Sequence, residues 1–206
     1  MYSMRMGRSG LAPTTRDLKA RDTRARIYES AWSLIVEKGF DKVSVDRICA
    51  GAGVAKGAFY HHYRSKGDLI VEGYAKCDAY FDDEVAGKLE AADAPGRIVE
   101  FVAHQMRYAV RTGIDMMRQV YKGQLENGTR FFVSSERSLP RILKSIVADG
   151  QASGELRADL DADYVVSFVL RFSRGTIYDW CLRDGSYDLE AVATEACRRL
   201  VAVFEP

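Results

Sequence analysis

Apolar residues recur at every third or fourth position through most of this 206-residue chain. Such a period places the apolar side chains on one face of an α-helix, so it predicts helices rather than strands. The first example begins at Arg16, carries Ile27 and Ile35 on one face, and ends near Gly39. Alternating strand patterns are nearly absent, and only residues 130–133 are ambiguous. We therefore expect an all-α fold.

The same period continues to the end of the sequence and predicts about nine helices in all. Pro95-Gly96 interrupts the pattern, and Gly113, Gly123 and Asn127-Gly128 are typical of turns between shorter helices. The most apolar segment is also long and spans residues 163–183. The remaining longer helices are expected over residues 68–86, 98–111, 139–148 and 189–204.

Residues 44–69 contain two short helix patterns that are separated by a glycine turn. Ser44 is a suitable N-cap for the first helix, because its hydroxyl can accept a hydrogen bond from a free backbone amide. Gly51 and Gly53 lie where the chain must reverse, and glycine adopts positive φ without steric strain. The second helix is expected over residues 55–63. Two short helices joined in this way form a helix-turn-helix, a motif with which many proteins read DNA.

The second helix of this motif has a composition that suits contact with DNA. Small residues at its start let a helix approach the major groove closely, and its polar side chains can donate to phosphates or base edges. Phe59 and Tyr63, four residues apart, are expected to anchor its inner side. A solvated pair is the alternative reading of the two adjacent histidines. The predicted DNA contacts are Ser44, Lys56, Gly57, Ala58, Tyr60, His61, His62 and Lys66.

Charge is distributed unevenly along the chain, although the formal net charge is only +1. Residues 1–70 carry 13 Lys and Arg against 7 Asp and Glu, a net charge of +6, whereas residues 71–206 carry 17 against 22, a net charge of −5. A protein with one DNA-facing end shows this asymmetry, and so does one with a merely solvated basic surface. We expect a mobile basic arm over residues 1–16, a DNA-binding domain over 17–67 and a second helical domain over 68–206.

Other kinds of site find little support in the sequence. Cys49, Cys77, Cys181 and Cys197 form no Cys-x-x-Cys pair and lie at no zinc-ligand spacing from the three histidines, so we expect no metal site. We find no phosphate loop and no Ser-His-Asp arrangement, and we expect no cofactor. No apolar run approaches the ~20 residues of a membrane span, and no secretory signal is recognisable. These features predict a cytoplasmic protein without a membrane partner.

Residues 20–70 resemble the tetracycline-repressor (TetR) family of bacterial transcriptional regulators. Ala52-Gly53-Val54 agrees with the family pattern, and residues 56–60, Lys-Gly-Ala-Phe-Tyr, are similar to its Lys-Gly-Thr-Leu-Tyr. Ser65-Lys66 followed by Asp68-Leu69 ends the motif as in the family. The many agreements in order and spacing make this resemblance specific. Beyond residue 70 it depends on the number and length of the helices.

Three departures from the family pattern concern which DNA sequence is read rather than whether DNA is bound. Ala55 stands where a capping Ser or Thr is usual, which weakens the N-terminus of the second helix. Ala58 replaces a Thr and so removes a hydroxyl that family members often offer to DNA. His61-His62 replaces bulkier or more basic pairs.

The resemblance implies a homodimeric repressor that is released from a palindromic double-stranded DNA operator by a small, largely apolar effector. Residues 174–180 also look like the penultimate helix of many members. Aromatic residues and methionines at helical spacing in the second domain then become candidates for an effector pocket, with plain core packing as the alternative. The candidates are His104, Met106, Tyr108, Met117, Tyr121, Phe168 and Phe172, followed by Met116, Phe131 and Phe132.

The last two predicted helices carry more apolar surface than a small domain needs for its own core. A two-fold four-helix interface with a second copy would cover it, and intrachain packing is the alternative. Arg171, Arg174 and Asp179 interrupt the apolar pattern and could contact a ligand or pair across such an interface. The residues that we assign to the dimer interface are Val165, Val169, Ile177, Trp180, Leu200 and Phe204.

Two other functions stay open at this point. An enzyme on a helical scaffold is one, but the sequence offers it no recognisable catalytic arrangement. A DNA-binding dimer without an effector is the other. A filled core in the second domain would favour that dimer, whereas an apolar cavity would argue against it.

Overall fold

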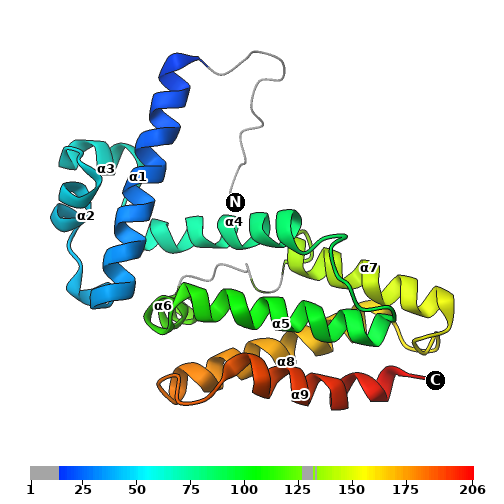
Figure 1. Cartoon of the computed structure of the whole chain (residues 1–206). Coiled ribbons are helices and arrows are strands. Elements are labelled where there is room, and N and C mark those ends of the chain that lie inside the picture. Colours follow the sequence, from blue (N-terminus) through cyan, green and yellow to red (C-terminus); the bar gives the residue numbers. More distant parts are fainter. Residues whose placement is uncertain (1–13, 127–131, 133) are drawn as a thin grey trace.

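A computed structural model describes residues 14–126, 132 and 134–206 of the chain. These residues form nine α-helices and no strand, which confirms the predicted all-α class. A short group of helices, α1 to α3, stands at one end of a longer helical stack (Figure 1). The bounds are α1 (Thr15–Lys38), α2 (Val45–Ala52), α3 (Lys56–His62), α4 (Gly67–Glu84), α5 (Ala94–Thr112), α6 (Ile114–Glu126), α7 (Ser138–Ser153), α8 (Ala162–Leu182) and α9 (Leu189–Val201), with the 3₁₀ helices η1 (Phe40–Lys42) and η3 (Ala202–Phe204).

Helix α1 begins at Thr15 because Thr14 caps it. The Thr14 hydroxyl accepts a hydrogen bond from the Asp17 amide at 3.2 Å, and the Asp17 carboxylate accepts one from the Thr14 amide at 3.0 Å. This reciprocal pair is a capping box. Residues 15 and 16, which the sequence assigns to a basic arm, are therefore helical. Residues 1–13 of that predicted arm lie outside the described residues.

A small hydrophobic core holds α1, α2 and α3 together. Ile27, Ile48 and Phe59, one from each of these helices, are fully buried in it. Leu69 from the start of α4 and Met116 from α6 belong to the same core. The three-helix unit is therefore packed directly onto two helices of the rest of the molecule, so a displacement of either helix bears on its position.

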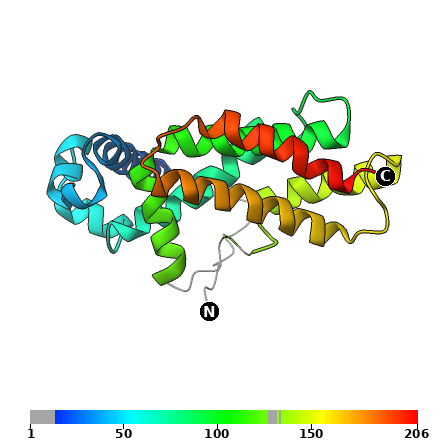
Figure 2. The same ribbon diagram turned by 90° about the horizontal axis from the view of Figure 1, so that it is seen from below.

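A larger core fills the stack that follows. Phe81 of α4 packs against Phe101 of α5, with ring centroids 5.2 Å apart, and Val169 of α8 and Cys197 of α9 are fully buried in the same cluster. Each buried Phe or Val side chain contributes about 1.5–3 kcal/mol, so the packing rather than intrinsic helix propensity stabilises these helices. Helices α8 and α9 lie side by side along one face (Figure 2).

Some predicted turns are wrong for physical reasons. Gly51 lies inside α2, where its missing side chain leaves room for α1, because a Cβ there would collide with the Ser30 Oγ. Gly123 lies inside α6. Pro95-Gly96 belongs to the first turn of α5 rather than to a break before it, and a proline is tolerated there because that turn's amides lack intrahelical partners. The predicted Asn127-Gly128 turn lies outside the described residues.

The four cysteines are free thiols that fill apolar positions. Cys49, Cys181 and Cys197 are buried and Cys77 is half-buried. Burial raises the pKa of Cys77 and of Cys197 to about 12, so both thiols stay protonated. Within the described part of the chain, no three His, Cys, Asp or Glu side chains gather as a metal site would require. None of the described helices is long and apolar enough to cross a membrane.

Candidate DNA-binding surface and effector cavity

Local interactions build the α2–turn–α3 unit. The Ser44 hydroxyl accepts a hydrogen bond from the Arg47 amide at 3.3 Å and so caps α2. Gly53 ends α2 with φ 63° and ψ 39°, in the left-handed region that glycine adopts without strain. Helix α3 follows without a side-chain cap, because Ala55 at its N-cap has no oxygen to offer. The glycine turn thus sets the angle between two helices that are too short to be stable alone.

Helix α3 has a buried side and an exposed side. Phe59 and Tyr63 are buried, which confirms that they anchor the helix. Tyr60 is 53% exposed, and His61 is exposed as well. At Gly57 a Cβ would meet no heavy atom within 4 Å. The outer side of α3 is therefore accessible to a large partner, and α2 and α3 lie on the side of α1 that faces away from the stack (Figure 1).

Polar contacts at the end of α3 fix it to the neighbouring helices. The Tyr63 hydroxyl donates a hydrogen bond to the Glu72 carboxylate of α4 at 2.6 Å. The Arg24 guanidinium of α1 pairs with the same carboxylate at 2.8 Å. Burial, together with the hydrogen bond to Glu72, raises the pKa of Tyr63 above its usual value, so the phenol remains a donor. One carboxylate thus ties three helices together.

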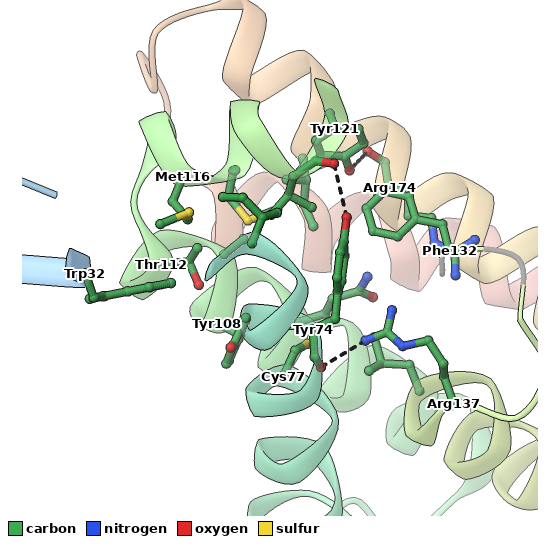
Figure 3. A pocket seen from close by; sticks show the side chains of 18 residues that line it. Trp32, Tyr74, Cys77, Tyr108, Thr112, Met116, Tyr121, Phe132, Arg137 and Arg174 are labelled. Atoms are coloured by element: carbon green, nitrogen blue, oxygen red, sulfur yellow. Dashed lines mark hydrogen bonds between the residues drawn. The ribbon is translucent and has the colours of Figure 1, made fainter. Parts of the chain in front are cut away.

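A cavity of about 70 Å³ lies where the three-helix unit meets the stack. Its lining residues come from α1, α4, α5, α6, α7 and α8 and from the segments that join them. Figure 3 shows Trp32 and Met116 on one side of it and Arg137 and Arg174 on the opposite side. The cavity therefore contacts both the three-helix unit, through Trp32, and the helical stack. Its aromatic walls are formed by Trp32, Tyr74, Tyr108, Tyr121 and Phe132.

The two arginines of the cavity differ in their partners. Arg137 pairs with Asp78 of α4 at 3.0 Å, and only 10% of its side chain is exposed. The Arg174 guanidinium lies 5.1 Å from the centre of the Phe132 ring, and no carboxylate of the described residues forms an ion pair with it. Burial, opposed in part by Tyr121 and assisted by the positive charge of Arg137, lowers the pKa of Arg174 to about 10. Arg174 still carries its charge at neutral pH.

Two protein-family models match the sequence. "Bacterial regulatory proteins, tetR family" matches residues 27–72, and "YsiA-like protein, C-terminal region" matches residues 99–203, about half of the chain. The chain belongs to the TetR family. The matches cover the helix-turn-helix and most of the stack, so both parts of the molecule correspond to the architecture of this family. The named relatives are transcriptional regulators rather than enzymes.

Several known proteins are similar along most of their length. The fatty acid metabolism regulator protein of Bacillus subtilis is 22% identical over 195 residues, which cover 86% of this chain and 93% of that protein. The TetR-family repressor FadR of Thermus thermophilus, solved with lauroyl-CoA, has a TM-score of 0.64 and 22% identity over 87% of this chain and 93% of its own. RolR, solved with resorcinol, has a TM-score of 0.59 and 21% identity over 89% of each chain. At such identities the structural likeness shows the fold alone.

Most of the DNA contacts predicted from the TetR pattern lie on the exposed side of the α2–α3 unit. The Lys56 ammonium pairs with Asp46 of α2 at 2.9 Å, so it lies on this surface. Burial, followed by the charge of His61, lowers the pKa of His62 below its usual 6.5. Contact with DNA stays a prediction for all of them. Ser44, Lys56, Gly57, Tyr60 and His61 are exposed, whereas Ala58 and His62 are half-buried.

Lys66 has a different environment from the one that the sequence predicts. Its ammonium donates to the backbone carbonyls of Phe40 and Val43, each at 2.8 Å, and lies 4.4 Å from the centre of the Phe40 ring. These contacts favour a structural role over a phosphate contact. Conversely, sequence reasoning missed Arg47, an exposed residue of α2 whose side chain forms no ion pair with a described residue. Its position opposite the buried Ile48 side of α2 was the only available signal.

Three of the seven predicted effector contacts line the cavity, namely Tyr108, Met117 and Tyr121. Met116 and Phe132, named as further candidates, line it as well, whereas Phe131 lies outside the described residues. The sequence missed Trp32 and Tyr74. Trp32 belongs to α1 of the predicted DNA-binding domain, and Tyr74 lies on the apolar side of α4, where the pattern indicates only core packing. It also missed Arg137, which precedes α7 and reaches the cavity through the tertiary fold.

The other four predicted effector contacts do not line this cavity. The His104 Nδ1 lies 2.9 Å from the Tyr80 hydroxyl, outside the cavity, and Met106 is fully buried in the main core. Phe168 packs against Phe204 at the far end of α8, with ring centroids 5.8 Å apart. Phe172 lies along a shallow surface groove on a different side of α8. Helical spacing alone does not distinguish these environments.

The predicted dimer residues are part of the chain's own core. Val165, Val169, Ile177, Trp180 and Phe204 are at most 7% exposed, and Leu200 is half-buried. They lie on the inward side of α8 and α9, where those helices pack against the stack. These side chains are therefore engaged within the chain itself, and their contact with a second copy stays a prediction. The outward side of α8 carries a different set of residues, namely Tyr164, Arg171, Gly175, Tyr178 and Leu182.

Proposed function

We propose that this TetR-family regulator is a homodimeric repressor that leaves a palindromic operator when a small molecule binds in the cavity of Figure 3. The observation that carries the proposal is the exposed side of α3, which presents Tyr60 and His61 above two buried anchors. Repression follows the precedent of the Thermus thermophilus relative, which is a transcriptional repressor. The three steps of the proposal are DNA contact, dimer formation and release.

DNA contact would use both helices of the α2–α3 unit. Gly57 and Ala58 keep the outer side of α3 narrow, so that its backbone can approach the floor of a major groove. Tyr60 and His61 project from the same side and can reach base edges or phosphates. Arg47, and Lys56 once it exchanges its partner Asp46 for a phosphate, add positive charge beside them, which gives affinity without sequence preference.

The dimer would form through the outward sides of α8 and α9. Tyr164, Gly175, Tyr178 and Leu182 lie on one side of α8 together with Arg171, at positions that a packed helical seam would use. Tyr164, Tyr178 and Leu182 are 49%, 46% and 63% exposed, and Val192 of α9 and Val203 of η3 are 47% and 57% exposed. A two-fold axis would bring each patch onto its copy and form a four-helix interface. Two α3 helices would then read two half-sites.

Release would depend on the contact between the cavity and the DNA-binding unit. Trp32 of α1 lines the cavity, and Met116 lines it while also belonging to the core of α1–α3. A ligand that enlarges the cavity must displace these side chains and therefore tilt α1 relative to α6. The change in the spacing of the two α3 helices would weaken DNA binding by as much as the ligand prefers the displaced conformation.

A fluorescent duplex with the DNA upstream of the protein's own gene tests the first two steps. Anisotropy should show saturable binding whose affinity falls steeply with salt concentration. Tyr60→Ala should weaken this binding by about 10-fold or more, since a base-edge or phosphate contact is worth ~1–3 kcal/mol. Val110→Ala, a truncation of an exposed apolar residue on α5, serves as the control and should bind as the wild type does.

Two results of the DNA titration would contradict the proposed role of α3. If the duplex binds no better than unrelated DNA at any salt concentration, or if Tyr60→Ala binds unchanged while folded by circular dichroism, the DNA-reading role of α3 is wrong. Light scattering on the same samples reports the dimer. If the protein that binds DNA is monomeric in solution and on the duplex, the homodimeric part of the proposal fails by itself.

A further inference from the structure

Arg174 points to the chemistry of the ligand that the cavity takes. It projects from α8 into the cavity wall, where its guanidinium lies against the face of Phe132. The contact with the ring supplies part of the attraction that a cation needs. No described carboxylate lies at ion-pair distance, although other arginines of the second domain, such as Arg137 and Arg141, have one. A charge in so apolar a place is stable only when something compensates it.

The charges around Arg174 determine how much negative charge a ligand must bring to neutralise the site. Arg137 lies on the same side of the cavity as Arg174 (Figure 3), and its charge is matched by Asp78 at 3.0 Å. The cluster of Arg137, Asp78 and Arg174 therefore carries one net positive charge. A monoanion would neutralise it, whereas a dianion would leave an excess negative charge in a low-dielectric site. The planar fork of a guanidinium matches the two oxygens of a carboxylate.

A second polar group of the cavity lacks a hydrogen-bond partner among the described residues. Gln105 of α5 lines the cavity and is 8% exposed, and its Oε1 has no hydrogen-bond partner among the described residues. An amide oxygen accepts a hydrogen bond and cannot donate one. A ligand hydroxyl or amine would therefore satisfy Gln105, and a wholly apolar ligand would not.

The remaining walls limit the size and shape of the ligand. Aromatic rings of Trp32, Tyr74, Tyr108 and Tyr121 surround the space, which favours a flat apolar body. The volume of about 70 Å³ is smaller than the roughly 150 Å³ that holds a benzene ring in an engineered cavity. Even a single ring must therefore displace lining side chains, and a long chain must displace many more.

We propose that the effector is a compact aromatic monocarboxylate with a hydroxyl or amino substituent, whose carboxylate pairs with Arg174 and whose substituent donates to Gln105. This inference rests on the proposed function, because it assigns the cavity to the effector. The aromatic body would extend from Arg174 toward Trp32 and Met116, on the side of the DNA-binding unit (Figure 3). Such a ligand would neutralise the charge of Arg174 at one end and, because its ring needs space at the other end, would displace α1.

Long-chain acyl thioesters fit these groups less well. The similar Thermus thermophilus protein was solved with lauroyl-CoA. An acyl chain in this cavity would offer only methylene groups to Arg174 and Gln105, and both would stay uncompensated. The structure therefore favours a carboxylate, and an acyl thioester becomes the competing outcome of the test.

Thermal unfolding of the full chain with matched probes tests the inference. The probes are benzoate, 4-hydroxybenzoate, 4-aminobenzoate, benzamide and lauroyl-CoA. The carboxylates should raise Tm by at least about 2 °C at saturation, the substituted ones most, and benzamide should not. Arg174→Met should weaken carboxylate binding about 10- to 100-fold, as expected for loss of a charged hydrogen bond. Arg174→Lys should recover part of the affinity.

Control variants separate the roles of the two anchors. Arg141→Met removes an exposed arginine of α7 that pairs with Asp82 and should bind the probes as the wild type does. Gln105→Met should remove the preference for 4-hydroxybenzoate over benzoate while benzoate binding stays within about twofold. Circular dichroism confirms that each variant is folded.

Several results would overturn the inference. They are a wild type whose Tm no carboxylate changes, equal binding of benzamide and benzoate, unchanged affinity in Arg174→Met, or a response to lauroyl-CoA alone. The DNA titration of the preceding section runs in parallel. If the protein binds DNA but no carboxylate, this inference is wrong and the proposed DNA-reading function stands. If it binds carboxylates but no DNA, the DNA-reading function is wrong and the assignment of the cavity to a carboxylate stands.

Discussion

The Tyr63 hydroxyl donates a 2.6 Å hydrogen bond to the Glu72 carboxylate, which Arg24 also contacts at 2.8 Å. Tyr63 follows the last residue of α3, Glu72 belongs to α4, and Arg24 belongs to α1. The orientation of the DNA-reading helix is therefore set by a polar contact at its C-terminal end, in addition to the apolar contact of Phe59. Because α4 continues along the cavity, this contact also links α3 to the site proposed for the effector.

Tyr63→Phe should destabilise the protein by about 1–2 kcal/mol. It removes a hydrogen bond to a charged acceptor and leaves the apolar ring in place. Urea unfolding followed by circular dichroism measures the change. Tyr60→Phe is the matched control, because that ring is exposed and its loss of a hydroxyl should stay within about 0.5 kcal/mol. Equal stability of both variants would show that the Glu72 contact contributes nothing to folding.

Lys66→Met should lower the stability of the protein, whereas Lys56→Met should change the salt dependence of DNA binding. Lys66 donates to two backbone carbonyls at 2.8 Å, so its loss should lower stability by about 1–3 kcal/mol and leave the salt dependence of DNA binding unchanged. Lys56 is an exposed cation in the first turn of α3, and its ion pair with Asp46 lies on the surface, so its loss should hardly change stability but reduce the salt slope by about one. Anisotropy titrations between 50 and 200 mM salt, together with urea unfolding, measure both effects. A shallower salt slope in Lys66→Met would restore it to the phosphate contacts.

Gly57→Ala should make the protein more stable and a poorer DNA binder. Its Cβ would meet no heavy atom within 4 Å, and alanine gains up to about 1 kcal/mol over glycine in a helix. The added methyl group points toward the proposed groove contact and should weaken DNA binding about 10-fold, or ~1.4 kcal/mol. A variant that is stabilised and binds DNA unchanged would show that this turn of α3 does not approach the DNA.

The helix-turn-helix was predictable because its determinants are close together in sequence. Ser44 caps α2, Gly53 supplies the left-handed turn, and Phe59 and Tyr63 repeat at four-residue spacing, so each assignment needs only a few neighbouring residues. The error at Gly51 has the opposite cause. Its reason for being glycine is the close approach of Ser30 from α1, about 20 residues earlier in the chain, which no local pattern records.

The cavity was only partly predictable, because helical periodicity identifies inward residues without saying what they face. Tyr108 and Met106 lie on the same helix two residues apart, yet one lines the cavity and the other fills the core. Likewise, α8 is apolar on two sides, and the sequence gives no sign that Val169 faces inward while Tyr178 faces outward. These distinctions arise from packing between helices that are distant in sequence.

Stability should fall as the pH is lowered through the titration range of His104. Burial, followed by the charge of Arg107, lowers its pKa below 6.5, while Glu100 and Glu190 oppose this shift in part. The Tyr80 hydroxyl, 2.9 Å from Nδ1, and Arg111 over the Tyr80 ring complete its surroundings. Because the folded pKa is depressed, the unfolded chain takes up the proton first, and stability is lost as the pH falls below about 6.5.

The measurement for His104 is the urea midpoint between pH 7.5 and 5. His104→Gln should show a smaller decrease over this window than the wild type does, because glutamine cannot titrate. The carboxylates of the chain contribute mainly at the acidic end, so the comparison between the two proteins isolates the imidazole. An identical pH dependence in both would show that the folded environment does not disfavour the charged ring.

Gly175→Arg should convert the proposed dimer into a monomer without harming the fold. Gly175 lies at the centre of the outward seam of α8, and a Cβ there would meet no heavy atom within 4 Å, so the chain itself has room for the side chain. In a two-fold interface each new charge would face its copy, and both would lose water on association. Light scattering should then report the 23.1 kDa chain rather than twice that mass.

Val110→Arg, which places the same charge on the exposed side of α5, should leave the dimer intact. Since a monomer presents only one α3 helix, Gly175→Arg should also lose most of its operator affinity while keeping the effector response, and a dimeric Gly175→Arg would show that the seam is not the interface.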